Sequence, residues 1–139
     1  MSLFEPNCNV SKIMMVTILA ASAGGITSTF LKPVAMRTWS KRNRYDVLAL
    51  CNGILVGAVS ITAVADRCEP WSAVIIGMIG GCVYVGACVL YRRLGVDDPI
   101  EASQVHGFGG IWGLIATGIF DNRKGLVSNH SEKWSFLAW

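Results

Sequence analysis

Four long stretches of this chain contain no charged residue. They occupy residues 13–31, 47–65, 71–91 and 102–120, and each is 19 to 21 residues long. A transmembrane α-helix needs about 20 consecutive apolar residues to cross the hydrocarbon core of a bilayer. Because a helix of a soluble protein normally keeps a charged face, the pattern predicts an all-α, polytopic transmembrane helix bundle with four spans.

The composition favours a membrane protein over two alternatives. Only 15% of the residues are charged and 53% are hydrophobic, whereas soluble domains carry about 25% charged residues. A soluble globule of four buried helices would have to build every helix without a charged face. A signal peptide would explain only the first stretch, which is longer than a typical signal core and has Lys12 as its one nearby basic residue.

The four spans divide the chain into three parts. We expect a polar N-terminal tail at 1–12, a single helical membrane domain at 13–120 and a polar C-terminal tail at 121–139. The lipid bilayer is therefore the expected surrounding of most of the chain.

The basic residues indicate how the spans are oriented. The loop at 32–46 holds five basic residues and the loop at 92–101 holds two, whereas the turn at 66–70 holds one. Since Lys and Arg collect in loops that stay in the cytoplasm, we expect both loops to be cytoplasmic and both termini to lie outside. The Asn-x-Ser triplets that begin at Asn9 and Asn129 would then face outside, but such triplets are common by chance and do not predict glycosylation.

The sequence carries no pattern typical of an enzyme. Its five cysteines include no CxxC pair, and we interpret them as small membrane residues, with a Cys8–Cys68 disulfide left open. There is no nucleophile–base pair, phosphate-binding loop or set of metal ligands, so we expect no enzyme, no cofactor and no metal site. The net charge of +3 arises from the loop at 32–46, which is too short and too near the membrane to indicate nucleic acid.

Glycine is concentrated in the predicted spans, which hold thirteen of the fifteen glycines. Small residues at i and i+4 let helices approach closely in lipid, where no hydrophobic effect drives them together. We therefore expect glycines to pack the helices, while some could also leave room for a narrow conduit. Three pairs have this spacing: Gly53/Gly57, Gly77/Gly81 and Gly109/Gly113.

Three carboxylates lie just before the fourth span. Asp98-Pro99-Ile100-Glu101 has the pattern of a helix start, with Asp98 as N-cap and Glu101 completing a capping box. Together with Asp97 they also place negative charge where the helix dipole favours it. The alternative is that the three set a negative potential at the cytoplasmic mouth of a cation pathway, and the pattern leaves both readings open.

His106 lies two turns inside the fourth span and is its only ionisable residue. A polar side chain at this depth is costly unless it has partners, and such residues are usually functional. We expect a pore or proton-relay histidine, the alternative being a buried histidine bonded to a neighbouring carbonyl. One histidine cannot hold zinc, but it can share hydrogen bonds or a proton with a small polar molecule. At helical spacing it shares a narrow face, turned away from lipid, with Ala102, Gly109, Gly110, Gly113 and Thr117.

The stretch DDPIEASQVHGFGGIWGLIATGIF, residues 97–120, closely resembles the tenth transmembrane helix of the ammonium transporter family (Amt/Mep/Rh), on the Amt side. Upstream, TILAASAGGITSTFL resembles the family's seventh helix, LCNGILVGAVSITA its eighth and EPWSAVIIGMIGGCVYV its ninth. The resemblance covers about residues 16–128, in order and with compatible spacing. The family's loops between the seventh and eighth and between the ninth and tenth helices are also cytoplasmic.

This resemblance implies a fold of eleven helices per subunit, assembled as a homotrimer with one pore through each subunit. It implies passage of ammonia or ammonium through a hydrophobic pore that contains two hydrogen-bonded histidines. His106 matches the second of these histidines, and Ala102 matches a small residue that borders the cytoplasmic half of the pore. Because desolvating ammonium is costly, the ion would lose its proton, and the paired imidazoles would stabilise neutral ammonia and pass the proton on.

The sequence has no counterpart of the family's first six helices or of its eleventh. It therefore lacks the first pore histidine, the external acidic residue and aromatic cage that recruit ammonium, and the phenylalanine gate. The resemblance implies a fragment of an ammonium channel or transporter of the plasma membrane that does not conduct by itself. The alternative is a non-transporting, truncated membrane subunit that modulates a full-length relative.

Overall fold

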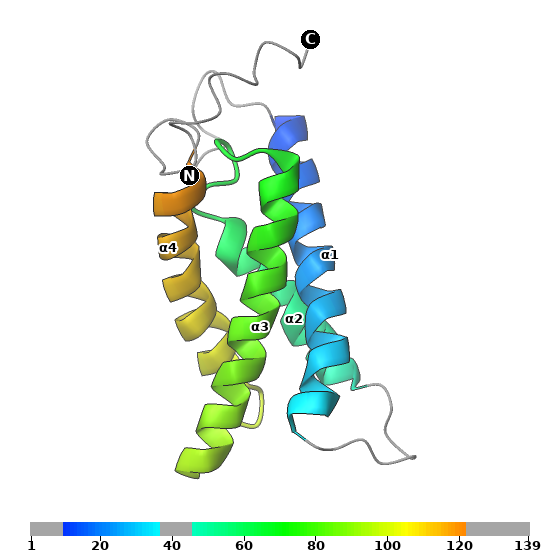
Figure 1. The fold of residues 1–139 in the computed structure, drawn as a ribbon, viewed down its shortest axis with the longest axis vertical. Coiled ribbons are helices and arrows are strands. Elements are labelled where there is room, and N and C mark those ends of the chain that lie inside the picture. The colour runs from blue at the N-terminus through cyan, green and yellow to red at the C-terminus, as the bar shows by residue number, and fades with distance from the viewer. Residues whose placement is uncertain (1–9, 37–45, 122–139) are drawn as a thin grey trace.

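The structure, a computed structural model, describes residues 10–36 and 46–121. Within them the chain forms four α-helices and one π-helical turn, and the helices run alternately down and up the long axis of the bundle (Figure 1). The expected all-α bundle is thereby confirmed. In chain order the elements are α1 (Val10–Ala35), α2 (Val47–Ile61), α3 (Pro70–Leu94), η2 (Ser103–Phe108) and α4 (Gly109–Phe120). Most of both expected tails, the middle of the basic loop, Cys8, Asn9 and Asn129 lie outside the described residues.

Two helices of the described part are long and apolar enough to cross a membrane, α1 with 26 residues and α3 with 25. α2 is apolar but has only 15 residues. It is shorter than expected because the chain leaves the α-helix after Ile61 and continues in tighter turns, in which the Val64 amide donates to the Ile61 carbonyl (3.0 Å). The fourth expected span is helical from Ala102 to Phe120, but η2 interrupts it and leaves 12 residues for α4.

The helix ends follow the local sequence. Asp46 caps α2 by accepting a hydrogen bond from the Leu48 amide (3.0 Å). Pro70 begins α3, where its missing N–H costs nothing, and Gly95 ends that helix in the left-handed conformation (φ 67°) that glycine adopts easily. α1 continues one turn beyond its expected end, so Lys32, expected in a loop, belongs to the helix.

Glycines bring α1 into backbone contact with α2 and α3. A Cβ atom added at Gly53 of α2 would lie 2.7 Å from the carbonyl oxygen of Gly24 in α1, and one at Gly81 of α3 would lie 3.0 Å from the same oxygen. The other member of each pair, Gly57 or Gly77, meets the α1 backbone more closely still. Any side chain at these positions would force the helices apart.

The third glycine pair packs α4 against α2. A Cβ atom at Gly109 would lie 2.6 Å from the Val56 side chain, and one at Gly113 would lie 2.9 Å from the Ser60 carbonyl oxygen. All six glycines with the predicted spacing therefore lie where helices meet.

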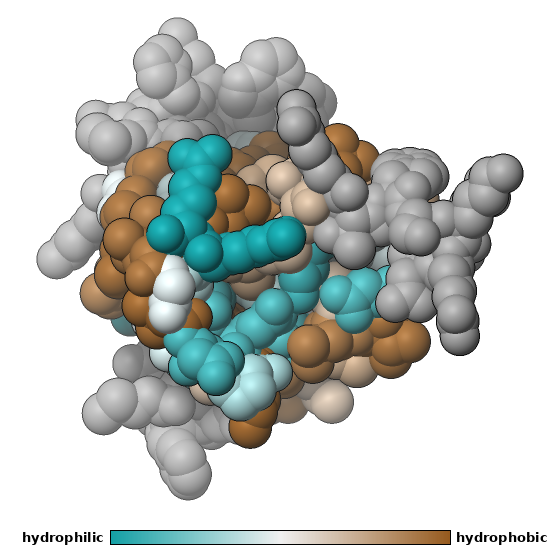
Figure 2. Space-filling view, turned by 90° about the horizontal axis from the view of Figure 1, so that it is seen from below, coloured by the Kyte–Doolittle hydropathy of each residue, from teal (hydrophilic) through white to brown (hydrophobic). Residues whose placement is uncertain are grey.

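Charged side chains of the described residues lie only at the two ends of the bundle. Seen from below, hydrophilic side chains gather in the middle of the lower end and hydrophobic ones surround them (Figure 2). The belt between the ends has no charged side chain among the described residues, as the apolar interior of a bilayer requires. The lower end holds Lys32, Asp46, Arg92, Arg93, Asp97, Asp98 and Glu101, and the upper end holds Lys12, Asp66, Arg67, Glu69 and Asp121.

Candidate functional site

His106 lies on the π-helical turn η2 and is exposed on the surface of the bundle. It is the only histidine of the described part, and it lies on the charge-free segment 102–120, five residues after Glu101 of the lower end. Ala102, one turn earlier in the chain, is exposed as well. Single π-helical turns within α-helices are rare and occur frequently at functional sites. The turn therefore presents an imidazole on an otherwise uncharged segment.

The π-helical turn splits the face on which His106 was expected to lie with the glycines of α4. Ala102 and His106 are exposed, whereas Gly109 and Gly113 are buried against α2. An α-helix turns by about 100° per residue, and a π-helical turn accommodates an extra residue. The faces before and after η2 are therefore rotated relative to each other, and the expectation of one shared face is wrong.

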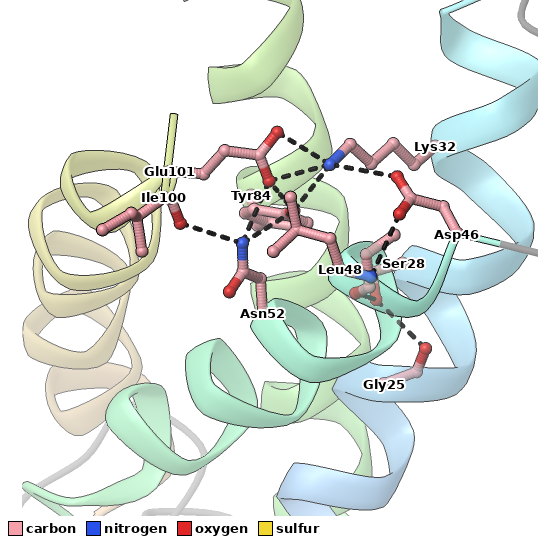
Figure 3. Close-up of polar contacts among 10 residues, drawn as sticks. Gly25, Ser28, Lys32, Asp46, Leu48, Asn52, Tyr84, Ile100 and Glu101 are labelled. Atoms are coloured by element: carbon pink, nitrogen blue, oxygen red, sulfur yellow. Dashed lines mark hydrogen bonds and ion pairs between the residues drawn. The ribbon is translucent and has the colours of Figure 1, made fainter. Parts of the chain in front are cut away.

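A buried polar cluster joins α1, α2 and α3 to the residues just before η2 (Figure 3). Lys32 of α1 is 5% exposed, and its Nζ atom lies 2.8 Å from both carboxylate oxygens of Glu101. Lys32 also donates to the hydroxyl of Tyr84 in α3 (2.9 Å), and this hydroxyl donates to Glu101. Asn52 of α2 donates to Glu101 Oε2 (3.0 Å) and to the Ile100 carbonyl (3.2 Å). We name Lys32, Asn52, Tyr84 and Glu101 the Lys32–Glu101 cluster.

Two further polar groups flank this cluster. Asp46, the cap of α2, places its Oδ2 atom 3.5 Å from Lys32 Nζ while its other oxygen accepts from the Leu48 amide. Ser28 of α1 donates to the Ala49 carbonyl of α2 (2.8 Å). Figure 3 shows both groups beside the cluster, on the side of α1.

The backbone of Glu101 adopts the left-handed conformation (φ 59°), the one non-glycine residue of the described part to do so. For such a residue this conformation costs on the order of 1–3 kcal/mol, and it persists only where surrounding contacts hold it. The Glu101 amide donates to the Asp98 carbonyl (3.1 Å), and its own carbonyl accepts from the Val105 amide (3.1 Å). Glu101 therefore joins the preceding turn to the start of the helical segment.

The three predicted carboxylates have three different environments. Asp98 Oδ2 accepts from the backbone amide of Ser103 (3.0 Å) and from its hydroxyl (2.8 Å). Glu101 does not form the predicted capping box, because the helical segment begins only at Ala102 and the left-handed backbone turns its side chain toward Lys32. Asp97 is exposed at the lower end.

The environments of two of these carboxylates lower their pKa. Burial alone would raise the pKa of Glu101, but the hydrogen bonds from Lys32, Tyr84 and Asn52 outweigh it and bring the pKa below its ordinary value. The hydrogen bonds from the backbone and hydroxyl of Ser103 lower the pKa of Asp98. Both groups are therefore held as carboxylates.

Three members of the Lys32–Glu101 cluster were not predicted as site residues. Asn52 is the one amide side chain in the second expected span, and Tyr84 is the one hydroxyl-bearing aromatic residue in the interior of the third. A polar group inside an apolar span needs a partner, and this signal could have singled out both. Lys32 carried a weaker signal, since a lysine at the end of a span ordinarily reaches toward water.

The chain matches the model of the Ammonium Transporter Family over residues 2–138. It is 42% identical to the ammonium transporter Amt2 of Archaeoglobus fulgidus over 123 residues, which are 88% of this chain and 25% of that protein. It is 38% identical over 124 residues to ammonium transporter 1 member 3 of Solanum lycopersicum, covering 89% of this chain and 26% of the relative. The chain thus belongs to the ammonium transporter family and spans about a quarter of the length of these relatives.

The fold matches solved structures of the same family. Saccharomyces cerevisiae Mep2 superposes with a TM-score of 0.70 at 36% identity, covering 80% of this chain and 23% of Mep2. A doubly substituted Mep2 of Candida albicans superposes with a TM-score of 0.75 at 26% identity, covering 91% of this chain and 30% of that one. The four helices are therefore a partial ammonium-transporter fold in a family of non-enzymatic membrane transporters.

Proposed function

We propose that this chain forms part of the wall of a transmembrane pathway for ammonia or ammonium, lined by His106 and Ala102. The carrying observation is the exposed imidazole on η2, within the segment 102–120 that has no charged side chain. Such a group is costly against lipid. The rest of a full-length transporter is therefore proposed to cover this face and to complete the pathway, so that the chain alone does not conduct.

The chemistry of the proposed pathway follows from the cost of burying an ion. Moving an ammonium ion into an apolar channel is strongly unfavourable unless the charge is compensated. Ammonia has no charge, and a neutral imidazole offers it one donor and one acceptor. We propose that ammonium transfers its proton to the acceptor nitrogen of a neutral imidazole in the pathway, that His106 exchanges hydrogen bonds with the ammonia, and that the imidazole passes the proton on separately.

The lower end of the bundle is proposed to face the cytoplasm. The end of α1, the end of α3, Asp46 before α2 and Glu101 before η2 lie at this end, so the described residues that border the loops at 32–46 and 92–101 lie on one side. Their basic residues support a cytoplasmic position. We propose that all four helical segments cross the plasma membrane, that both termini lie outside, and that the complete assembly is a homotrimer. Because Lys32 neutralises Glu101, attraction of cations to this mouth is proposed for Asp97 and Asp98.

The test is ammonium uptake by cells that lack their own ammonium transporters. The chain is expressed alone and together with a full-length relative, and its presence in the membrane is verified in both cases. We expect no uptake from the chain alone. Uptake by the chain alone would contradict the proposal that it needs further helices.

The mixed expression separates two outcomes. Reduced uptake by the full-length relative would favour the alternative function, a non-transporting subunit that modulates trimer assembly. Unchanged uptake would count against the modulating subunit and favour the proposal that the chain forms part of the pathway wall. Substitution of His106 tests that proposal directly.

A further inference from the structure

We propose that Asn52, Tyr84 and Lys32 are positioning residues for His106: they hold the turn at Ile100–Glu101, just before η2, and so set the direction of the imidazole. The importance of this positioning for transport rests on the proposed function of His106. The positioning itself concerns only how the Ile100–Glu101 turn is held.

The turn is fixed from three helices at once. Asn52 of α2 bonds both the Ile100 carbonyl and the Glu101 carboxylate, and Tyr84 of α3 and Lys32 of α1 bond the same carboxylate. The donors are rigidly placed because Lys32, Asn52 and Tyr84 are 5%, 5% and 0% exposed. A single residue is thus held by side chains from three packed helices.

The connection from this turn to His106 is short and runs through the backbone. The Glu101 carbonyl accepts from the amide of Val105, the residue immediately before His106. A change in the Glu101 backbone therefore acts on Val105, and through it on the position from which the imidazole projects.

The contacts of the Lys32–Glu101 cluster hold the Glu101 backbone in its strained, left-handed conformation. Without its side-chain partners the residue would favour the right-handed region, in which the backbone of non-glycine residues is relaxed. The helical segment could then extend toward Asp98 as an ordinary α-helix. If the π-helical turn became regular α-helix, the direction of the His106 side chain would rotate by about 100° about the helix axis relative to α4.

The experiment uses the 139-residue chain in lipid nanodiscs, in a His130→Gln background that leaves His106 as the only histidine. Two variants each remove one holding group, Asn52→Leu and Tyr84→Phe. The matched control is Ser28→Ala, which removes a buried hydroxyl that bonds α2 at a carbonyl outside the cluster.

Two readouts are compared, the nitrogen chemical shifts of the imidazole and the hydrogen exchange of the amides at 103–109. Loss of one holding hydrogen bond should speed exchange at 103–109 by about tenfold and shift the imidazole signals in Asn52→Leu and Tyr84→Phe. Protection in the middle of α1 and α3 should not change. The Ser28→Ala control should leave the imidazole signals and the exchange at 103–109 as they are.

Unchanged imidazole signals and exchange in both variants would overturn the proposal. If Asn52→Leu unfolds the chain, the result for Tyr84→Phe alone tests the proposal, because this substitution removes only one oxygen atom and disturbs the packing least. Loss of protection throughout α1 and α3 in Tyr84→Phe would also overturn it, because the cluster would then support the whole bundle rather than the turn. Neither readout involves ammonium, so the outcome is independent of whether His106 serves transport.

Discussion

The side-chain nitrogen of Lys32 lies 2.8 Å from both carboxylate oxygens of Glu101, across 69 residues of sequence. Only 6% of the Lys32 side chain and 16% of the Glu101 side chain are exposed. Each charge is therefore largely removed from water and depends on the other. The pair joins α1 to the turn just before η2 at the lower end of the bundle.

Removing one charge of this pair should destabilise the bundle strongly. Lys32→Met keeps the length of the side chain but leaves the largely buried carboxylate of Glu101 without its cation. We expect the free energy of unfolding to fall by about 3 kcal/mol, the scale for breaking a buried pair from one side. Denaturant unfolding of the chain in detergent micelles, followed by circular dichroism, measures the change.

The matched comparison is the double variant Lys32→Met with Glu101→Leu. Removing both charges abolishes the unpaired carboxylate, so the double variant should be more stable than Lys32→Met alone. Equal destabilisation of the two variants would show that the charges do not depend on each other.

Acidification should weaken the bundle through Glu101. Its pKa in the folded chain lies below the ordinary 4.5, so the folded state favours the ionised carboxylate. The resulting stability is fully present above the ordinary pKa and is lost as the pH falls through the lowered folded value. Unfolding measured between about pH 7 and pH 3 should show this loss.

A Glu101→Gln variant serves as the reference for the acid effect. It keeps the size of the side chain and an acceptor oxygen but cannot titrate, so its stability should fall less steeply with acid. Asp98, whose pKa is lowered from 3.8, remains in this variant and contributes a residual loss in the same direction. Identical pH profiles for the two proteins would exclude Glu101 as the source.

The helices and their packing could be predicted because they depend on local patterns. Charge-free stretches marked all four helical segments, and the GxxxG spacing marked Gly53 and Gly57, which lie against α1. In lipid, close approach of helices requires small residues at regular intervals. Such a requirement can be read without knowing which helix is the partner.

The polar cluster could not be predicted in the same way because its members come from four separate segments. The sequence pattern around Glu101 was compatible with a capping box, and only the partnership with Lys32 and Tyr84 overrides that local preference. The π-helical turn could not be predicted from the sequence for a related reason. Its residues SQVHGF have no periodicity of their own, and the turn depends on how the preceding residues are held.

Substitution of a packing glycine should separate α1 from its neighbours. In Gly57→Ala the added methyl group would meet the backbone of α1, with an Ala21 Cα atom 2.9 Å away. Since backbone cannot yield as a flexible side chain does, we expect a loss of about 1–3 kcal/mol of stability. Gly86→Ala is the control, because a Cβ atom at Gly86 has no neighbour within 4 Å among the described residues. It should be neutral or slightly stabilising, and equal losses for both would refute the packing argument.

Substitution of His106 tests the proposed pathway itself. The 123-residue segment that is 42% identical to Archaeoglobus fulgidus Amt2 is exchanged into that transporter, and the chimera is first shown to support uptake. His106→Ala should then reduce uptake or alter ammonium-over-potassium selectivity. Because the side chain is exposed in the bundle of α1–α4, its removal from the 139-residue chain should change stability by no more than about 0.5 kcal/mol. Met78→Ala, an exposed apolar residue of α3, is the matched control and should leave uptake intact. Unchanged flux together with unchanged selectivity in His106→Ala would remove this histidine from the pathway.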